Sequence, residues 1–301
     1  MWTSALALLV AQAAFDADAS FDAYELRLEA RSADEACSVF TAVERDLLDA
    51  AIKRSRDDAV MQGASPGQLD GFERRHDETF ETACRTAFDL PGVALHRQET
   101  LRLSGYDQAR FDGRAQGWTA QRGGFSDEFA QWRIVQSLRQ GAANFGIFQH
   151  GDETGLALSL RTGRQPAYAV AYLRDVDQAP EPVDLTAGGL LPTPGDDPVS
   201  AWGAPSDRLE RIFATQALSR QRAGELAPAS GEPAVGFVFP QALTEALTTL
   251  SPREGARIDL YDGTGTVIDR YWVEVGAFDA ALAFMRLPTM APQATTPPPS
   301  N

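Results

Sequence analysis

The sequence predicts an α+β protein in which a disulfide-pinned N-terminal helical hairpin packs on or beside a mixed, mainly antiparallel β body with peripheral helices. Residues 36–83 repeat their apolar side chains at helical spacing, later segments alternate as strands do, and two cysteines flank the helical stretch. The 301 residues are 44% hydrophobic, which is enough for a full core. No apolar run approaches the ~20 residues of a membrane-spanning helix.

The N-terminal segment predicts export. Residues 4–10 are uncharged and lead to Ala11-Gln12-Ala13, the small-x-small pattern after which a signal peptidase cuts, so we expect a signal peptide at 1–13. No Lys or Arg precedes the apolar run, and the alternative is the apolar start of a cytosolic protein. No cysteine follows the run to carry a lipid anchor. We therefore expect export to the periplasm or cell envelope of a bacterium.

The two cysteines, Cys37 and Cys84, predict a disulfide, because thiols pair in an oxidising compartment; two buried free thiols are the alternative. They are too few for a typical zinc site and too far apart for a C-x-x-C redox pair. The two can face each other in a helical hairpin if the first helix ends near Arg56. Cys37 then lies 19 residues before that end, and Cys84 lies 18 residues beyond Pro66. We therefore expect a turn that begins around Asp57.

The region from 20 to 90 is expected to hold a strand followed by this helical hairpin. Alternation of apolar and charged residues over 24–28 predicts a short strand. The Ser-x-x-Glu pattern at 32–35 is a capping box for the first helix. Ser65 followed by Pro66 begins the second helix, because the missing N–H of proline costs nothing in the first turn.

The region from 91 to 287 is expected to form the α+β body, and 288–301 a disordered, proline-rich tail. In chain order we expect strand-like residues at 93–103, a loop or weak hairpin at 105–124, a helix at 126–141, strands at 144–148, 156–160 and 168–173, an irregular Pro-rich loop at 175–205, a helix at 206–222, a strand at 235–239, a helix from Pro240, a hairpin from 258 to 275 and a helix at 278–285.

No motif identifies a catalytic or cofactor site. Residues 63–67 match the G-x-S-x-G nucleophile elbow, but that motif follows a strand, and its oxyanion hole needs an N–H that Pro66 lacks. His76 fits the apolar stripe of the second helix, and His150 lies in a turn between strands. Neither of these, nor His96, has the spacing of a metal ligand. We expect no metal and no cofactor.

The charge balance narrows the possible partners. The chain carries 27 basic and 42 acidic residues, a net charge of −15, so nucleic acid and an anionic membrane surface would be repelled. Lys53 is the only lysine and lies among charges in a predicted helix, which disfavours Schiff-base and phosphate-loop chemistry. A hydrolase that uses acidic residues in a cleft of the body remains the alternative function, although no carboxylate pair stands out.

The last hairpin offers one possible binding patch. Its alternation places Tyr261, Arg270 and Trp272 on the face opposite to its apolar residues. An exposed Tyr–Trp patch flanked by charges suits contact with a protein or a glycan. The alternative is that another layer, such as the helix expected around Trp132, covers these rings.

The closing part of the chain carries a resemblance. A strand ending in Phe239-Pro240 leads to a Leu-rich helix at 243–250, a hairpin, and a Gly-x-Phe-x-x-Ala-Leu pattern at 276–282. This order is similar to the end of exported bacterial proteins of the invasion-associated locus B kind, although their cysteines have no counterpart in this stretch. The resemblance implies a periplasmic or surface, mainly β module without known catalysis. We therefore expect an exported, non-enzymatic accessory protein that binds a protein or an envelope glycan.

Overall fold

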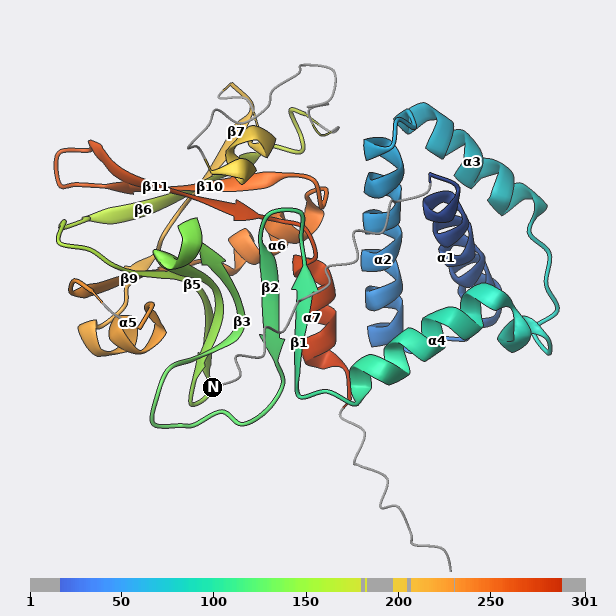
Figure 1. Cartoon of the computed structure of the whole chain (residues 1–301), viewed down its shortest axis with the longest axis horizontal. Helices are drawn as coiled ribbons and strands as arrows, with labels where there is room; N and C mark the ends of the chain where they lie inside the picture. The colour runs from blue at the N-terminus through green and yellow to red at the C-terminus, as the bar shows by residue number, and fades with distance from the viewer. Residues whose placement is uncertain (1–16, 180–181, 183–196, 205–206, 230, 289–301) are drawn as a thin grey trace, which may run out of the picture.

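A helical lobe stands beside a β body, and helix α2 of the lobe packs against helix α7 of the body (Figure 1). The computed structural model describes residues 17–288 apart from 180–181, 183–196, 205–206 and 230. The expected signal peptide at 1–13 and most of both the 175–205 loop and the 288–301 tail lie outside the described residues. The α+β class is confirmed. Among the described helices, none is long and apolar enough to cross a membrane.

The described part of the lobe contains four α-helices. They are α1 (Ala17–Cys37), α2 (Ala42–Met61), α3 (Pro66–Thr79) and α4 (Pro91–Ser104). Helix α3 begins after Ser65, the expected cap. Helix α4 packs against α1, so the strand expected at 93–103 is wrong. Its buried residues Val93, His96 and Thr100 recur three and four positions apart, which is the spacing of one helix face.

Helix α1 also replaces the expected N-terminal strand. Tyr24 and Leu28 are both fully buried and lie four residues apart, about one helical turn. The Ser-x-x-Glu pattern at 32–35 lies inside this helix and does not begin one. The capping box belongs to α2, where the Thr41 side chain accepts from the Glu44 backbone N–H and the Glu44 carboxylate accepts from the Thr41 N–H.

Helix α2 continues to Met61, so the end expected near Arg56 and the turn expected at Asp57 are wrong. Asp57 is held in the helix by a contact with the body. Its side chain is buried, and its Oδ2 accepts hydrogen bonds from Ser251 Oγ at 2.5 Å and from the Arg253 backbone N–H at 3.0 Å. Burial raises the pKa of the Asp57 carboxyl. The helix therefore extends one turn further than its charge pattern suggests.

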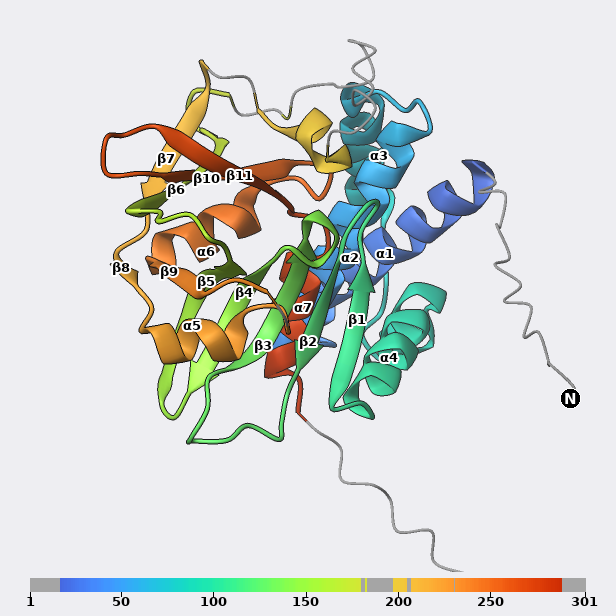
Figure 2. The ribbon, with the colours of Figure 1, turned by 60° about the vertical axis from the view of Figure 1, so that its left-hand side comes forward.

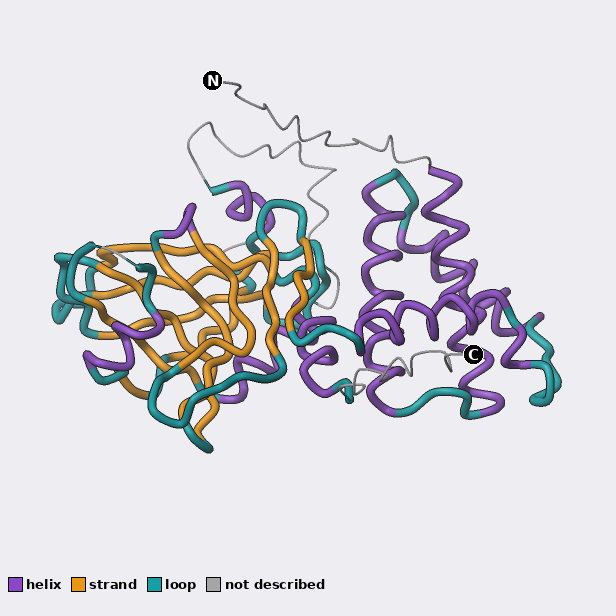
Figure 3. The backbone as a smooth tube through the Cα atoms, turned by 60° about the horizontal axis from the view of Figure 1, so that its bottom comes forward, coloured by secondary structure: helices purple, strands orange, loops and turns teal. Residues whose placement is uncertain are grey.

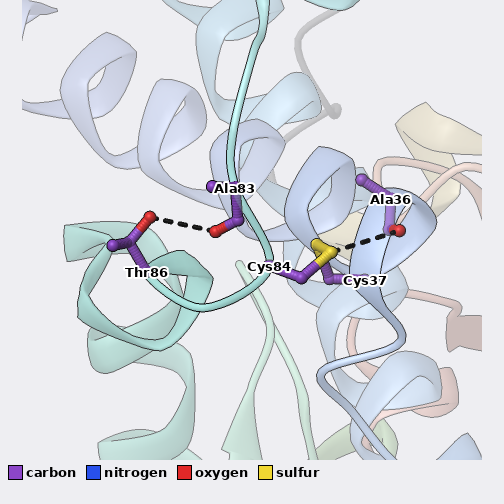
Figure 4. The surroundings of a disulfide bond; sticks show 5 residues. All are labelled: Ala36, Cys37, Ala83, Cys84 and Thr86. Carbon is purple, nitrogen blue, oxygen red and sulfur yellow. Dashed lines mark hydrogen bonds between the residues drawn. A yellow bond between two sulfur atoms is a disulfide. The ribbon is translucent and has the colours of Figure 1, made fainter.

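The expected disulfide between Cys37 and Cys84 is present, with Cα atoms 5.3 Å apart (Figure 4). The register that led to this prediction is wrong. Cys37 is the last residue of α1, and Cys84 lies in the segment that follows α3 (Figure 4). The bridge therefore joins the end of one helix to a loop, rather than two facing helices of one hairpin.

The described body contains two antiparallel sheets (Figures 1 and 2). In spatial order the first sheet consists of β1 (Gln108–Asp112), β2 (Gly117–Gln121), β3 (Gln131–Leu138), β4 (Ala143–His150), β5 (Glu153–Arg161), β9 (Ala234–Phe239) and β8 (Gln216–Ala217). The second consists of β11 (Val267–Glu274), β10 (Gly255–Tyr261), β6 (Tyr168–Arg174) and β7 (Leu209–Phe213). The helices of the body are α5 (Arg220–Leu226), α6 (Gln241–Thr249) and α7 (Phe278–Arg286).

One apolar core joins the two sheets to α6 and α7. Trp118 from the first sheet, Ile258 from the second and Phe278 from α7 are all buried in it. The Trp118 and Phe278 ring centroids lie 4.7 Å apart. On its other side α7 presents Ala283 to Leu47 of α2. Figure 3 shows the strands gathered on one side of the molecule and most helices on the other.

Two helices expected in the body are wrong. Residues 126–141 contain β3, and 206–222 contain β7, β8 and the start of α5. In β3 the buried residues are Ile134, Gln136 and Leu138, at every second position, so the strand period prevails over a helical spacing that is also present. The hairpin at 105–124, the strands at 144–148, 156–160, 168–173 and 235–239, the helix after Pro240, the hairpin from 258 to 275 and the last helix are confirmed.

Candidate functional site

The β10–β11 hairpin directs its aromatic residues to two faces. Ile258 and Tyr271 are buried in the core, whereas Tyr261, Arg270 and Trp272 lie on the outer face of the second sheet. Arg270 is exposed, and the two aromatic rings are half-buried. Tyr261 and Trp272 lie toward opposite ends of the hairpin. The three residues therefore do not form one continuous patch.

Tyr261 belongs to a layer of tyrosines on this outer face. Its ring stacks on Tyr168, with centroids 4.8 Å apart and planes inclined by 5°. Its hydroxyl lies 2.5 Å from the Tyr172 hydroxyl. Burial, together with this hydrogen bond, raises the pKa of Tyr261 to about 12. The phenol therefore stays neutral, and its contacts lie within the sheet.

Arg270 is held by a buried carboxylate. Asp259 is 1% exposed, and its two oxygens accept from Arg270 Nε at 2.7 Å and Nη2 at 3.2 Å. Arg257 Nε lies 3.3 Å from the same carboxylate. The hydrogen bonds to Asp259 raise the pKa of the Arg270 guanidinium. Arg270 is thus a fixed, permanently charged donor at the surface.

Arg270 and Trp272 line a groove of about 750 Å³ between the edge of the second sheet and the β1–β2 and β3–β4 connections. Tyr261 is not among the lining residues. The polar and aromatic side chains that line the groove are those of Arg110, Gln116, Ser137, Arg139, Gln140, Asp197, Arg270 and Trp272. Of these residues, the alternation along the hairpin pointed only to Arg270 and Trp272.

The Trp272 ring is held in place by backbone. Gly203 lies so close to the ring that a Cβ at this position would be 2.5 Å from Trp272 Cζ3, a distance that side chains do not tolerate. Glycine is therefore required there for packing. The covered edge fixes the orientation of the indole, and the rest of the ring lines the groove.

The β3–β4 connection contributes strained backbone. Arg139 and Gln140 have φ angles of 45° and 54°, in the left-handed region that residues other than glycine rarely adopt, and Gly141 follows at 92°. Contacts of Arg139 support this conformation, because its Nη1 donates to Asp269 Oδ1 at 2.8 Å and its guanidinium lies 4.5 Å from the Tyr271 ring centre. Strain of this kind is concentrated at functional sites.

The charges of the groove are compensated. Arg139 is paired with Asp269, Arg270 with Asp259, and Arg110 with Asp112. Asp197 accepts from the Val199 backbone N–H at 3.0 Å, and burial raises its pKa. Asp197 is the only carboxylate among the described residues that line the groove. The groove thus offers fixed donors and acceptors with little net charge.

The other residues considered in the sequence lie apart from this groove and from one another. Ser65 caps α3 and is no nucleophile elbow. His76 stacks on Phe80, and His96 is buried with its Nε2 at 2.8 Å from a backbone carbonyl. His150 contacts an arginine of α5. Over the described part of the chain, no three His, Cys, Asp or Glu side chains are grouped to hold a metal ion.

The residues that sequence analysis missed had one signal, the glycine at 141, which is typical of a left-handed position but says nothing about the two residues before it. Comparison of the chain with protein-family models, with curated proteins and with solved structures found no match.

Proposed function

We propose that the protein is an exported, non-enzymatic binding protein of the bacterial periplasm or cell envelope, and that its groove binds a neutral, hydroxyl-rich glycan. One observation carries the proposal. The immobilised Trp272 ring lies beside Arg139 and Arg270, and both arginines already have carboxylate partners. An aromatic face beside fixed hydrogen-bond donors suits a ligand whose C–H and O–H groups alternate.

The charge distribution favours a neutral ligand over an anionic one. The net charge of −15 repels anions at long range, and the carboxylates of Asp259 and Asp269 offset the arginines at short range. A guanidinium has five N–H donors, of which Arg270 uses two on Asp259. The remaining donors are available to hydroxyl oxygens of a ligand.

The polarity of the groove favours a glycan over a protein. Protein interfaces derive most of their affinity from apolar anchors in dry pockets. Trp272 is the only aromatic side chain among the described groove residues, and amide and hydroxyl groups surround it, including Gln116, Ser137 and Gln140. The single carboxylate, Asp197, supports binding rather than hydrolysis, because glycoside hydrolysis typically uses two.

Two observations support the export part of the proposal. Residues 4–13 have the pattern of a signal peptide, and the Cys37–Cys84 bridge requires an oxidising compartment to persist. N-terminal sequencing of protein from the native cell should begin near Ala14. Recovery of chains that retain Met1 from the cytoplasm would contradict export.

Calorimetric titration of the full chain with maltohexaose, cellohexaose and chitohexaose tests the binding proposal. We expect saturable binding of at least one, with less than a twofold change in affinity between about 50 and 500 mM salt. Trp272→Ala should weaken it by about thirtyfold, the effect of losing an interface hot spot. Phe213→Ala is the matched control, because Phe213 is an exposed aromatic residue of the same sheet outside the groove.

Three results would contradict the proposal. One is no binding of any of these oligosaccharides, and a second is equal losses in the Trp272 and Phe213 variants. The third is release of reducing ends during the titration, which would favour the hydrolase instead.

A further inference from the structure

The two sheets of the body have four edge strands, and three of these edges carry some protection against pairing. Along β11 the carbonyls of Ile268, Arg270 and Glu274 accept hydrogen bonds from side chains of other segments. At β1 the Asp112 carbonyl accepts from Arg54 of α2. The β8 edge is only two residues long. Short and covered edge strands keep a sheet from adding a strand of another chain.

The β7 edge has no such protection. Strand β7 pairs with β6 on one side only, and Figure 2 shows it on the side of the body away from the helical lobe. The Ala214 N–H donates to the Ala169 carbonyl at 3.0 Å, so the even-numbered residues of this edge bond to β6. The backbone N–H and C=O groups of Leu209, Arg211 and Phe213 therefore point outward, and no described residue bonds to them.

The side chains at this edge include two complementary groups. Phe213 is 57% exposed, and its ring centroid lies 6.4 Å from that of Tyr168. Arg211 is also exposed and forms no ion pair with a described residue. Both lie on the outer face of the second sheet, whereas Ile212 between them faces the core. A guanidinium placed over an aromatic ring is attracted to it, so a strand that carries both groups can pair with a copy of itself.

We propose that β7 pairs with β7 of a second copy of this chain, antiparallel and about a two-fold axis. The two four-stranded sheets then form one continuous eight-stranded sheet across the dimer. Main-chain hydrogen bonds between outward-pointing groups join the copies, as in other complexes formed by strand addition.

The side chains select one register. Residues that share a face must stay on it, so even-numbered residues oppose even-numbered ones. With Ile212 on the two-fold axis, Arg211 of each copy opposes Phe213 of the other, and Glu210 opposes Ala214. No like charges face each other directly, and each exposed ring receives a guanidinium.

The neighbouring registers are less favourable. Arg211 on the axis would place two guanidinium groups directly opposite each other, and Glu210 on the axis would do the same with two carboxylates. Phe213 on the axis would extend the pairing past the end of β7, where the Thr215 N–H already donates to the Val238 carbonyl of β9 at 2.8 Å. The first register therefore remains.

Sedimentation equilibrium of the full chain from about 1 μM to about 1 mM tests the pairing, and the mass should rise from that of one chain toward that of two. Arg211→Pro should weaken the dimer about thirtyfold, because each copy loses one N–H···O bond to the other. Proline at an outward-pointing edge position leaves the bonds to β6 intact. Gln108→Pro is the matched control at an outward-pointing position of the β1 edge, and it should dimerise as the unmodified chain does.

Single cysteines locate the axis. In Ile212→Cys the two introduced thiols face each other in a non-hydrogen-bonded pair, whose Cα atoms lie about 4.5 Å apart, within the range of a disulfide. Oxidation should therefore link two copies covalently. Phe213→Cys should not link, because its two copies are diagonal neighbours about 7–8 Å apart.

A chain that stays monomeric up to about 1 mM would overturn the inference, and so would a dimer that forms equally well with Arg211→Pro. Linkage of Phe213→Cys in place of Ile212→Cys would contradict it too, and this measurement does not depend on the fold of the proline variant. Trp272→Ala should dimerise as the unmodified chain does, so this inference stands or falls separately from glycan binding.

Discussion

The helical lobe and the β body are stabilised in different ways. The body has a large continuous core that includes both sheets and two helices. The core of the lobe is smaller, and it is supplemented by a disulfide, by the contacts of Tyr24 and Arg56 with Glu73, and by the docking of α2 on the body. Small units bury a lower fraction of their surface and need such additions. The lobe therefore depends on a few specific contacts, whereas the body depends on many.

Removal of the disulfide should have the largest effect on this contrast. Cys37 and Cys84 are separated by 47 residues, and closing a loop of that length contributes about 4 kcal/mol in the chain-entropy model. In Cys37→Ser/Cys84→Ser the lobe should unfold at lower denaturant concentration than the body, which gives two transitions by circular dichroism. A single transition, shifted as a whole, would mean that the two parts are one cooperative unit.

Asp57→Ala should have the next largest effect. It leaves the Ser251 hydroxyl and the Arg253 backbone N–H without their acceptor, at a cost of about 2–3 kcal/mol. The neighbouring residue Asp58 is half-buried, and no described residue donates a hydrogen bond to its carboxylate, so Asp58→Ala is the control. Chemical denaturation of both variants measures the difference, and equal losses would show that α2 is not anchored through Asp57.

Acid should weaken the lobe through His96. Burial lowers the pKa of His96 in the folded state, so its contribution to stability is present above the ordinary value of about 6.5 and is lost as the pH falls through the folded value. His96→Gln should remove this part of the pH dependence, a smaller effect than that of Asp57→Ala. Thermal melts of the unmodified chain and of His96→Gln from neutral to acidic pH measure it, and the same pH dependence in both would contradict this role of His96.

The smallest expected effect has opposite signs in the two parts. Gln140→Gly in the body relieves a left-handed residue and should raise stability by about 0.5 kcal/mol. Gln98→Gly, the same substitution on the exposed face of α4, should lower it by about 1 kcal/mol, the helix penalty of glycine. Denaturation midpoints of the two variants measure these changes. A loss of stability in both would show that the Gln140 backbone carries no strain.

Whether a helix or strand could be predicted from the sequence depended on how many residues its apolar pattern covers. The C-terminal strands and helices were predictable because their apolar residues continue over several periods. At Tyr24 and Leu28 the apolar residues fit both a strand with period two and a helix with spacing four, and burial against α3 and α4 decides for the helix. At 126–141 the same ambiguity was resolved in favour of the strand by pairing with β2 and β4.

The candidate groove shows the same limit. Alternation along one hairpin predicted correctly that Arg270 and Trp272 share its outer face. Gln116 lies far from them in sequence and enters the groove only through the packing of two sheets. Contacts between distant segments leave no local pattern to read.

The hydrogen bond between Asp57 and Arg253 joins residues 196 positions apart. The helices of the lobe are contiguous in the chain and are synthesised first, yet the residues that receive α2 are made near the end. Contacts between residues so far apart in the sequence form late in folding, because the entropy cost of closing a long loop comes before the contact stabilises the chain. The lobe is therefore the first part to be made and the last to be docked.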